Sequence, residues 1–384
     1  MSGLNNNKAF CILPFIHLHV DERNDVKLCC VASQHTVDKY STEFDFKTNP
    51  ALQQVRQDML DGKRVPHCKT CYEFDDGKTD SLRTRENKEW SVTLGINDVT
   101  QVSTDLIYYD VRNDNLCNLG CRMCGPQSSS QLEKEFIEIG WPVSSSAKSF
   151  GFNDVIDLDT VKRVYVAGGE PSIMPTFRQF LKRAVESGKT DFELRMNTNA
   201  TNLNQEYRDL LKNFEYLHIT VSLDGYDQIN RYIRWPSDWN TIIKNVHGLY
   251  EITDHISFNV TVSIWNISNL SQLVFALEKE FLSPDILLNR VTYPVANECT
   301  TFPNKELAIA DLEKIKESRS YNHNTSFRSK IDYYITEMQN SKLNKVALWR
   351  FFKYNDSLDK SRNIKLHDYI PELETCRELI TKQI

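Results

Sequence analysis

The stretch Cys117-Asn118-Leu119-Gly120-Cys121-Arg122-Met123-Cys124 carries three thiols in eight residues. Spacers of three and two residues let one loop wrap these thiols around a single inorganic centre. Thiolates select zinc, copper(I) or iron–sulfur clusters, and three of them leave one iron of a 4Fe-4S cluster open to an outside ligand. The alternative is a structural zinc site that a distant Cys or His completes.

Around this loop, apolar β-branched runs alternate with helical patterns. We predict strands near residues 106–111, 163–167, 192–197, 216–222, 256–263 and 286–291. Helices are predicted near residues 127–139, 175–187, 205–213, 239–252 and 269–281. Strict alternation favours an α/β fold with a parallel sheet, and right-handed crossovers would roll that sheet into a partial (β/α)6 barrel.

Polar motifs follow the later strands, at the ends where barrel enzymes build their sites. Gly168-Gly169-Glu170-Pro171 comes after the second strand, and its glycines let the backbone approach a ligand while the carboxylate can accept from an ammonium group. The motifs after the next three strands are Asn197 to Asn199, then Ser222 and Asp224, then Asn266. One such motif alone indicates a turn. Together they predict a ligand with an amine, a carboxylate and ribose hydroxyls.

On these residues the sequence resembles the radical S-adenosylmethionine (radical SAM) superfamily over about residues 105–293. The resemblance implies an enzyme whose Cys117, Cys121 and Cys124 bind a 4Fe-4S cluster. S-adenosylmethionine would chelate the open iron and be cleaved reductively to a 5′-deoxyadenosyl radical, which abstracts a hydrogen atom from substrate. The residues that the resemblance places at this cofactor are Met123, Gly168, Gly169, Glu170, Pro171, Asn197, Asn199, Ser222, Asp224 and Arg234. Met123 departs from the aromatic residue that is common near the adenine.

A second group of cysteines lies in a small N-terminal segment of α+β texture. Cys11, the pair Cys29-Cys30, and Cys68 with Cys71 offer four or five thiols. The segment contains an expected hairpin over residues 15–29 and an expected helix that Asn49-Pro50 opens. Its apolar content is small for a self-supporting core, so a bound metal would add stability. Zinc and iron–sulfur clusters use the same four thiolates, and both remain open from the residues alone.

The order of these motifs resembles the twitch domain, a shortened SPASM domain that carries one auxiliary 4Fe-4S cluster. The resemblance implies Cys11, Cys29, Cys68 and Cys71 as its ligands. Cys30 is the alternate for Cys29, because adjacent strand residues face opposite sides. That domain usually follows the barrel, whereas here it precedes it. We expect an auxiliary domain over residues 1–90, the barrel over 100–300, and a helical C-terminal extension over 301–384.

The composition is that of an ordinary globular protein. The chain has 384 residues, a net charge of −6, 40% hydrophobic and 26% charged residues. It has no basic excess, so nucleic acid is a disfavoured partner. The N-terminus lacks a secretion signal and no run of 18 apolar residues occurs, which predicts a cytoplasmic protein without a membrane span.

The resemblance implies several partners and leaves two function classes open. Flavodoxin or ferredoxin would supply the electron, and the auxiliary cluster would hold the substrate or accept its electron. A peptide is the first expected substrate, although no leader-binding domain is recognisable; a radical SAM dehydrogenase acting on a sugar or another small molecule is the alternative. The rival class is a zinc-stabilised binding or scaffold protein. For His17 and His19, which share one strand face, we expect surface or packing roles.

Overall fold

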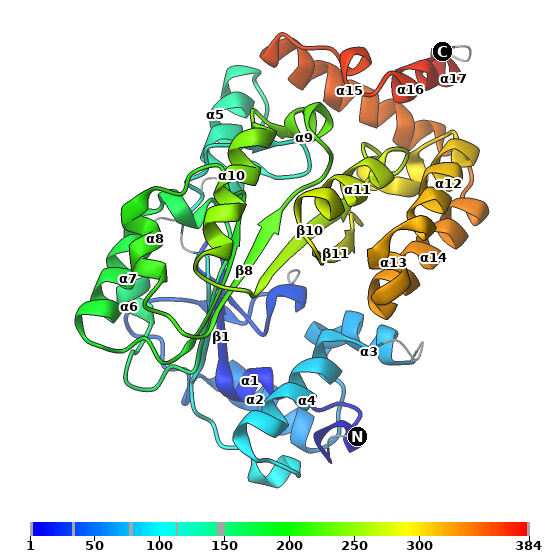
Figure 1. Cartoon of the computed structure of the whole chain (residues 1–384). Coiled ribbons are helices and arrows are strands. Elements are labelled where there is room, and N and C mark those ends of the chain that lie inside the picture. Colours follow the sequence, from blue (N-terminus) through cyan, green and yellow to red (C-terminus); the bar gives the residue numbers. More distant parts are fainter. Residues whose placement is uncertain (1–2, 33–34, 77–79, 113, 144–149, 382–384) are drawn as a thin grey trace. The chain divides into compact units, whose positions relative to one another are not determined.

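The computed structural model describes residues 3–32, 35–76, 80–112, 114–143 and 150–381 (Figure 1). The chain divides into two units, and each is described by itself. The first unit takes in residues 1–115, 145–196 and 213–216, and the second takes in residues 116–144, 197–212 and 217–384.

The sheet of the first unit joins the N-terminal hairpin to barrel strands. Its order is β7-β6-β4-β1-β2-β3, with β1, β4, β6 and β7 parallel and β2 and β3 antiparallel. The strands are β1 (His17–Val20), β2 (Asp25–Lys27), β3 (Asp38–Lys39), β4 (Tyr108–Val111), β6 (Arg163–Val166) and β7 (Glu193–Thr198). The hairpin strand β1 is thus the parallel neighbour of β4, a pairing that the sequence pattern did not predict.

Helices of the first unit begin at recognisable caps. They are α1 (Leu13–Ile16), α2 (Pro50–Leu60), α3 (Lys69–Asp76), α4 (Leu82–Leu94), α6 (Phe152–Val155) and α7 (Pro175–Glu186). The Asn49 side chain accepts from the backbone N–H of Leu52 at 3.1 Å, and Pro50 occupies the first helical position, which has no intrahelical partner for an N–H. The helix expected after Asn49 is confirmed.

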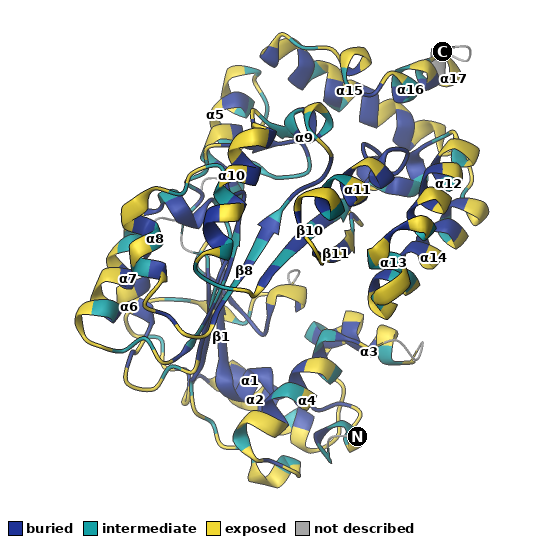
Figure 2. Cartoon of the chain, in the orientation of Figure 1, coloured by how far each residue is buried: buried dark blue, intermediate teal, exposed yellow. Residues whose placement is uncertain are grey.

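The second unit contains three parallel strands in the order β11-β10-β8. They are β8 (Leu217–Ser222), β10 (Ile256–Val262) and β11 (Asp285–Arg290), and the helices among them are α8 (Gln205–Leu211), α10 (Trp239–Tyr250) and α11 (Leu270–Glu280). Along β8 and β10, buried apolar residues alternate with half-buried polar ones (Figure 2). The barrel strands and helices predicted from the sequence are all present, with ends shifted by at most three residues.

The cysteine loop and the C-terminal helices also belong to the second unit. The loop precedes α5 (Ser130–Glu138), and a short bridge joins β5 (Gly120–Cys121) to β9 (Arg234–Trp235), which follows α9 (Gln228–Ile233). The C-terminal helices are α12 (Lys305–Lys314), α13 (Arg319–His323), α14 (Thr325–Asn340), α15 (Lys345–Arg362), α16 (Pro371–Glu374) and α17 (Glu378–Thr381). Trp265 packs on Phe351 of α15 with ring centroids 5.4 Å apart. Within the described ranges, no helix has the length and apolar composition of a membrane span.

Candidate functional site

The three cysteines of residues 117–124 lie in a loop that the β5–β9 bridge holds. The bridge sets Cys121 opposite Arg234. Cys121 is buried, and Cys117 and Cys124 are half-buried. The backbone N–H of Cys124 donates to the carbonyl of Cys121 at 3.0 Å, which makes a tight turn between these two thiols. All three thiols therefore come from one short turn-rich loop, as their spacing predicted.

The Arg234 guanidinium lies between a carboxylate and a thiol. Its Nε is 2.5 Å from Oδ2 of Asp224, and its Nη1 donates to Sγ of Cys121 at 4.0 Å. Asp224 is fully buried and also accepts from the backbone N–H of Thr261 at 2.7 Å. Burial raises the pKa of the Cys121 thiol, and the Arg234 charge partly opposes that rise. Asp224 and Arg234, which the resemblance placed at the cofactor as separate residues, therefore form an ion pair.

Asn199 connects the end of β7 to the cysteine loop. Its amide donates to the side-chain oxygen of Asn118 at 3.0 Å, and the Asn118 amide donates to Thr201 Oγ1 at 2.8 Å. Side-chain hydrogen bonds of Asn118 therefore link the cysteine loop to the segment that follows β7. The predicted residues Asn197 and Ser222, in the same unit, are half-buried and lie on β7 and at the end of β8; Met123 is half-buried within the loop.

The Gly-Gly-Glu-Pro loop lies in the first unit, directly after β6. Gly168 and Gly169 have φ of 83° and 52°, in the left-handed region that favours glycine. A Cβ at Gly168 would lie 3.1 Å from Glu22 Oε1 and 3.2 Å from Arg112 Cβ, so a side chain here would crowd both residues. The buried Glu170 carboxylate accepts from both the backbone N–H and the hydroxyl of Ser172, at 3.1 and 2.7 Å, and Pro171 starts the 3₁₀ turn η6 (Pro171–Ile173). Because Gly168 and Gly169 carry no side chains, a ligand can approach the backbone of this tight loop closely.

Residues 115–271 match the family model described as the radical SAM superfamily. The chain carries a radical SAM domain. The matched range contains the cysteine loop, the Gly-Gly-Glu-Pro loop and the predicted cofactor residues that follow β7 and β8. In domains of this family a 4Fe-4S cluster works together with S-adenosylmethionine, and the match covers residues 115–271 of this chain.

Similar solved structures include SuiB of Streptococcus suis bound to the precursor peptide SuiA, at 13% identity and a TM-score of 0.35 over 86% of this chain and 71% of that one. Another is anSMEcpe with bound AdoMet, at 12% identity and a TM-score of 0.40 over 59% of this chain and 62% of that one. No curated protein matches the sequence. At these identities and TM-scores, the peptide of SuiB and the reactions of both enzymes cannot be assigned to this chain.

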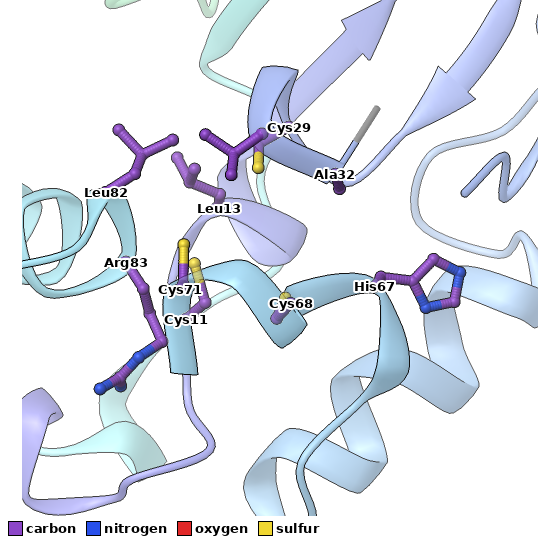
Figure 3. Close-up of a pocket in the computed structure, with 10 residues that line it drawn as sticks. Cys11, Leu13, Cys29, Ala32, His67, Cys68, Cys71, Leu82 and Arg83 are labelled. Carbon is purple, nitrogen blue, oxygen red and sulfur yellow. The ribbon is translucent and has the colours of Figure 1, made fainter. Parts of the chain in front are cut away.

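Outside the radical SAM domain, four N-terminal cysteines line one small cavity of the first unit. Its lining includes Cys11, Cys29, Cys68, Cys71, Leu13, His67 and Arg83. Figure 3 shows the sulfur atoms of Cys11 and Cys71 pointing toward that of Cys29, whereas the Arg83 guanidinium and the His67 ring point away from them. Cys30 is exposed and does not line this cavity. Of the two adjacent cysteines, Cys29 is therefore the one that faces the other thiols.

Burial and mutual repulsion govern the chemistry of these thiols. Burial raises the pKa of Cys11 and Cys29 well above the ordinary value, and neighbouring cysteines add to the rise. The pKa of Cys68 is raised to about 12 by burial and by Cys29 and Cys71. Without a bound cation Cys11, Cys29 and Cys68 therefore hold their protons at neutral pH. A metal centre that binds them must displace the protons, so binding releases protons and stabilises the fold.

The donor set of each cysteine group limits the inorganic centre that it could hold. Thiolates bind both tetrahedral zinc and iron–sulfur clusters. The four cavity cysteines and the three loop cysteines therefore fit an iron–sulfur cluster by donor type, and zinc uses the same donors.

His17 and His19 have environments that sequence patterns did not reveal. Both are buried, which excludes the surface role considered for them. His19 Nδ1 lies 2.8 Å from Oδ2 of Asp110, and Arg112 Nε lies 3.2 Å from the other oxygen of that carboxylate. Burial lowers the pKa of His17 to about 4, so this ring is neutral at pH 7. The sequence feature that could have indicated these environments was the spacing of two residues between His17 and His19 on one strand, next to charged residues.

Proposed function

We propose that this chain is a radical SAM enzyme with two 4Fe-4S clusters, one at the cysteine loop and an auxiliary one in the N-terminal cysteine cavity. The observation that carries the first assignment is the placement of Cys117, Cys121 and Cys124 on one loop inside the matched domain. The second rests on four thiols that line one buried cavity. The cofactor pair, when bound, supplies a 5′-deoxyadenosyl radical that abstracts a hydrogen atom from substrate.

The protein's own residues position the cofactors and exclude water. Arg234, held by Asp224, places a positive charge at Cys121, where it offsets thiolate charge. The Asn199 amide donates a hydrogen bond to the side chain of Asn118 in the loop. The Gly168–Gly169 backbone and Glu170 are the groups that would meet the amino end of S-adenosylmethionine. Asn197 and Ser222 are half-buried polar groups suited to its ribose or carboxylate.

The substrate that this sheet suits is hydrophilic. One face of β10 carries the half-buried polar residues Ser257, Asn259 and Thr261, while the alternating residues of the other face are buried and apolar. β8 repeats this pattern with His218, Thr220 and Ser222. Parallel sheets are ordinarily covered on both faces and carry apolar residues on both. A polar face on such a sheet therefore favours a ligand with many hydrogen-bonding groups.

A peptide is the first substrate to test, because the N-terminal motif order resembles that of twitch domains. A sugar or another polar small molecule is the alternative, and flavodoxin or ferredoxin is the proposed reductant. Deuterium transfer into 5′-deoxyadenosine from fully deuterated extract separates the classes: transfer from the peptide fraction supports a peptide, and transfer only from the small-molecule fraction overturns that choice.

The two-cluster assignment is tested by iron and sulfide content and visible spectra of anaerobically purified protein. We expect about eight irons per chain, falling to about four when Cys117, Cys121 and Cys124 are all replaced by Ala. Reduction with dithionite in the presence of S-adenosylmethionine should yield 5′-deoxyadenosine from the wild type and none from this variant. The control is Cys376→Ala, at a buried cysteine outside both groups, which should keep all the iron. Colourless protein that holds zinc after reconstitution would overturn the proposal in favour of a binding or scaffold protein.

A further inference from the structure

The C-terminal helix α15 holds the backbone on both sides of Cys121. Arg362 Nη2 donates to the carbonyl of Gly120 at 2.7 Å, and the Tyr354 hydroxyl donates to the carbonyl of Arg122 at 2.8 Å. These two carbonyls belong to the residues before and after the cysteine. They are reached from a helix more than 230 residues later in the sequence.

The Arg122 side chain makes a third connection to the same helix. It is fully buried, its Nη2 lies 2.5 Å from Oδ1 of Asp359, and its Nη1 donates to Oδ1 of Asn355 at 2.9 Å. Its Nε donates to the carbonyl of Tyr232 at 2.8 Å, and its guanidinium carbon lies 3.6 Å from the centre of the Tyr232 ring. Every nitrogen of this guanidinium therefore has a partner, which is what a buried cation requires.

The charges in this network are balanced in pairs. Arg362 donates from Nε and Nη2 to the two carboxylate oxygens of Glu135 on α5, at 2.9 and 2.6 Å. Asp359 balances Arg122 and also accepts from the Tyr232 hydroxyl at 3.0 Å and from the backbone N–H of Leu366 at 2.8 Å. Both ion pairs are buried. Attachment of α15 alone does not require these pairs, because the helix already buries Leu348, Phe351 and Phe352.

The cysteine loop itself has little regular structure to hold it. Besides the two-residue bridge β5–β9, the Ser129 hydroxyl donates to the carbonyl of Leu119 at 2.6 Å, and the backbone N–H of Arg122 donates to the carbonyl of Ile233 at 2.8 Å. The carbonyls of Gly120 and Arg122 accept from α15. Such bonds from surrounding residues fix a ligand's orientation and tune the metal centre it holds. Tyr354 and Arg362 of α15 donate hydrogen bonds to the backbone of this loop. Bonds of this kind fix where the loop lies, which apolar packing of the helix alone would not do.

We propose that α15 is a positioning element of the radical SAM cluster, in which Tyr354, Asp359 and Arg362 hold Cys121 in its ligating place. This inference rests on the proposed 4Fe-4S cluster at Cys117, Cys121 and Cys124. Binding and stability are linked thermodynamically. A metal centre that binds only the ordered loop stabilises the packing of α15, and substitutions that destabilise α15 weaken binding of the metal centre. The C-terminal extension is thereby part of the cofactor site.

The mildest test is Tyr354→Phe, which removes one hydroxyl. We expect anaerobic iron release to a chelator about fivefold faster than in the wild type, the factor that corresponds to one lost hydrogen bond. The matched control is Lys360→Ala, at an exposed position of the same helix, and it should release iron at the wild-type rate. Equal rates in Tyr354→Phe, Lys360→Ala and wild type would overturn the proposal.

A second pair of variants separates charge from geometry at Arg362. Arg362→Gln removes a cation near Cys121 and should shift the reduction potential of this cluster to more negative values, because net charge helps to set that potential. Arg362→Lys keeps the charge and should restore the potential, while losing the two-point contact with Glu135 and therefore still releasing iron faster. Potentials that do not differ between the Gln and Lys variants would overturn the charge role.

Hydrogen exchange tests the reciprocal effect without any activity measurement. In the loaded full-length protein, amides of α15 should exchange more slowly than in the variant with Cys117, Cys121 and Cys124 replaced by Ala. Identical exchange would overturn the coupling. Failure of the underlying cluster assignment is seen separately, because that triple variant would then keep all the iron of the wild type.

Discussion

Arg122, a fully buried residue between two cysteines of the cysteine loop, forms an ion pair with Asp359 of α15, 237 residues later in the sequence. The pair makes the C-terminal helix part of the environment of Cys121. Loop position, helix stability and metal binding are consequently expected to change together.

The Glu135–Arg362 pair should be essential for stability. Glu135→Gln leaves the buried Arg362 guanidinium without its carboxylate, and removing one partner of a buried pair costs about 3–5 kcal/mol. The measurement is the free energy of unfolding from urea titration. Glu138→Gln, at an exposed position of the same helix, is the control and should change stability by less than about 0.5 kcal/mol. Equal stabilities of the two variants would contradict the prediction.

Cys29 rather than Cys30 should be needed for the auxiliary iron. Cys29 lines the cavity with Cys11, Cys68 and Cys71, while Cys30 is exposed outside it. Cys29→Ala is therefore expected to lower iron content from about eight to about four per chain, and Cys30→Ala should leave it unchanged. Iron and sulfide analysis of both variants decides the matter, and loss of iron from the Cys30 variant alone would reverse the assignment.

Gly168→Ala should weaken binding of S-adenosylmethionine. The substitution combines backbone strain of about 1 kcal/mol with a Cβ crowded by Glu22 and Arg112. Gly62→Ala is the matched control, because Gly62 has a similar φ of 76° but open space around its Cβ. Both variants should lose similar stability from strain, and equilibrium dialysis should show weaker cofactor binding in the Gly168 variant alone. Wild-type affinity in that variant would argue against a cofactor role for this loop.

His17 should make the stability of the fold depend on pH. Burial lowers its pKa from 6.5 to about 4, so the unfolded chain takes up a proton near pH 6.5 while the folded chain takes it up only near pH 4. The contribution to stability is complete above pH 6.5 and is lost as the pH falls toward 4, at up to about 1.4 kcal/mol per pH unit. Urea titrations at about pH 7 and about pH 5 measure this loss. In His17→Gln the loss should be smaller by about 2 kcal/mol.

The exposed His367 offers a control for the pH experiment. His367→Gln makes the same chemical change at the surface, and it should retain the wild-type fall in stability between the two pH values. A His17 variant with the same fall as the His367 variant would show that the buried ring is not the group responsible.

The resemblance to twitch domains implied the set of four N-terminal thiols. Periodicity and spacing in the chain were sufficient for the order of the barrel strands and helices and for the three-thiol loop. These are local properties, because hydrophobic period sets the element type and short spacers bring thiols onto one loop. Hydrogen-bonded side-chain caps such as Asn49 are equally local, which is why the start of α2 was predictable from the chain alone.

Long-range pairing accounts for what the chain's pattern did not reveal. β1 pairs with β4 across some ninety residues, and Asp224 forms an ion pair with Arg234 that the sequence did not predict. The preference for Cys29 over Cys30 agrees with the cavity, which Cys29 lines and Cys30 does not. The alternation argument behind that preference does not apply directly, because β2 ends at Lys27 and Cys30 opens a 3₁₀ turn. The Arg122–Asp359 pair depends on how α15 packs, since a buried cation is stable only where the fold brings a carboxylate to it.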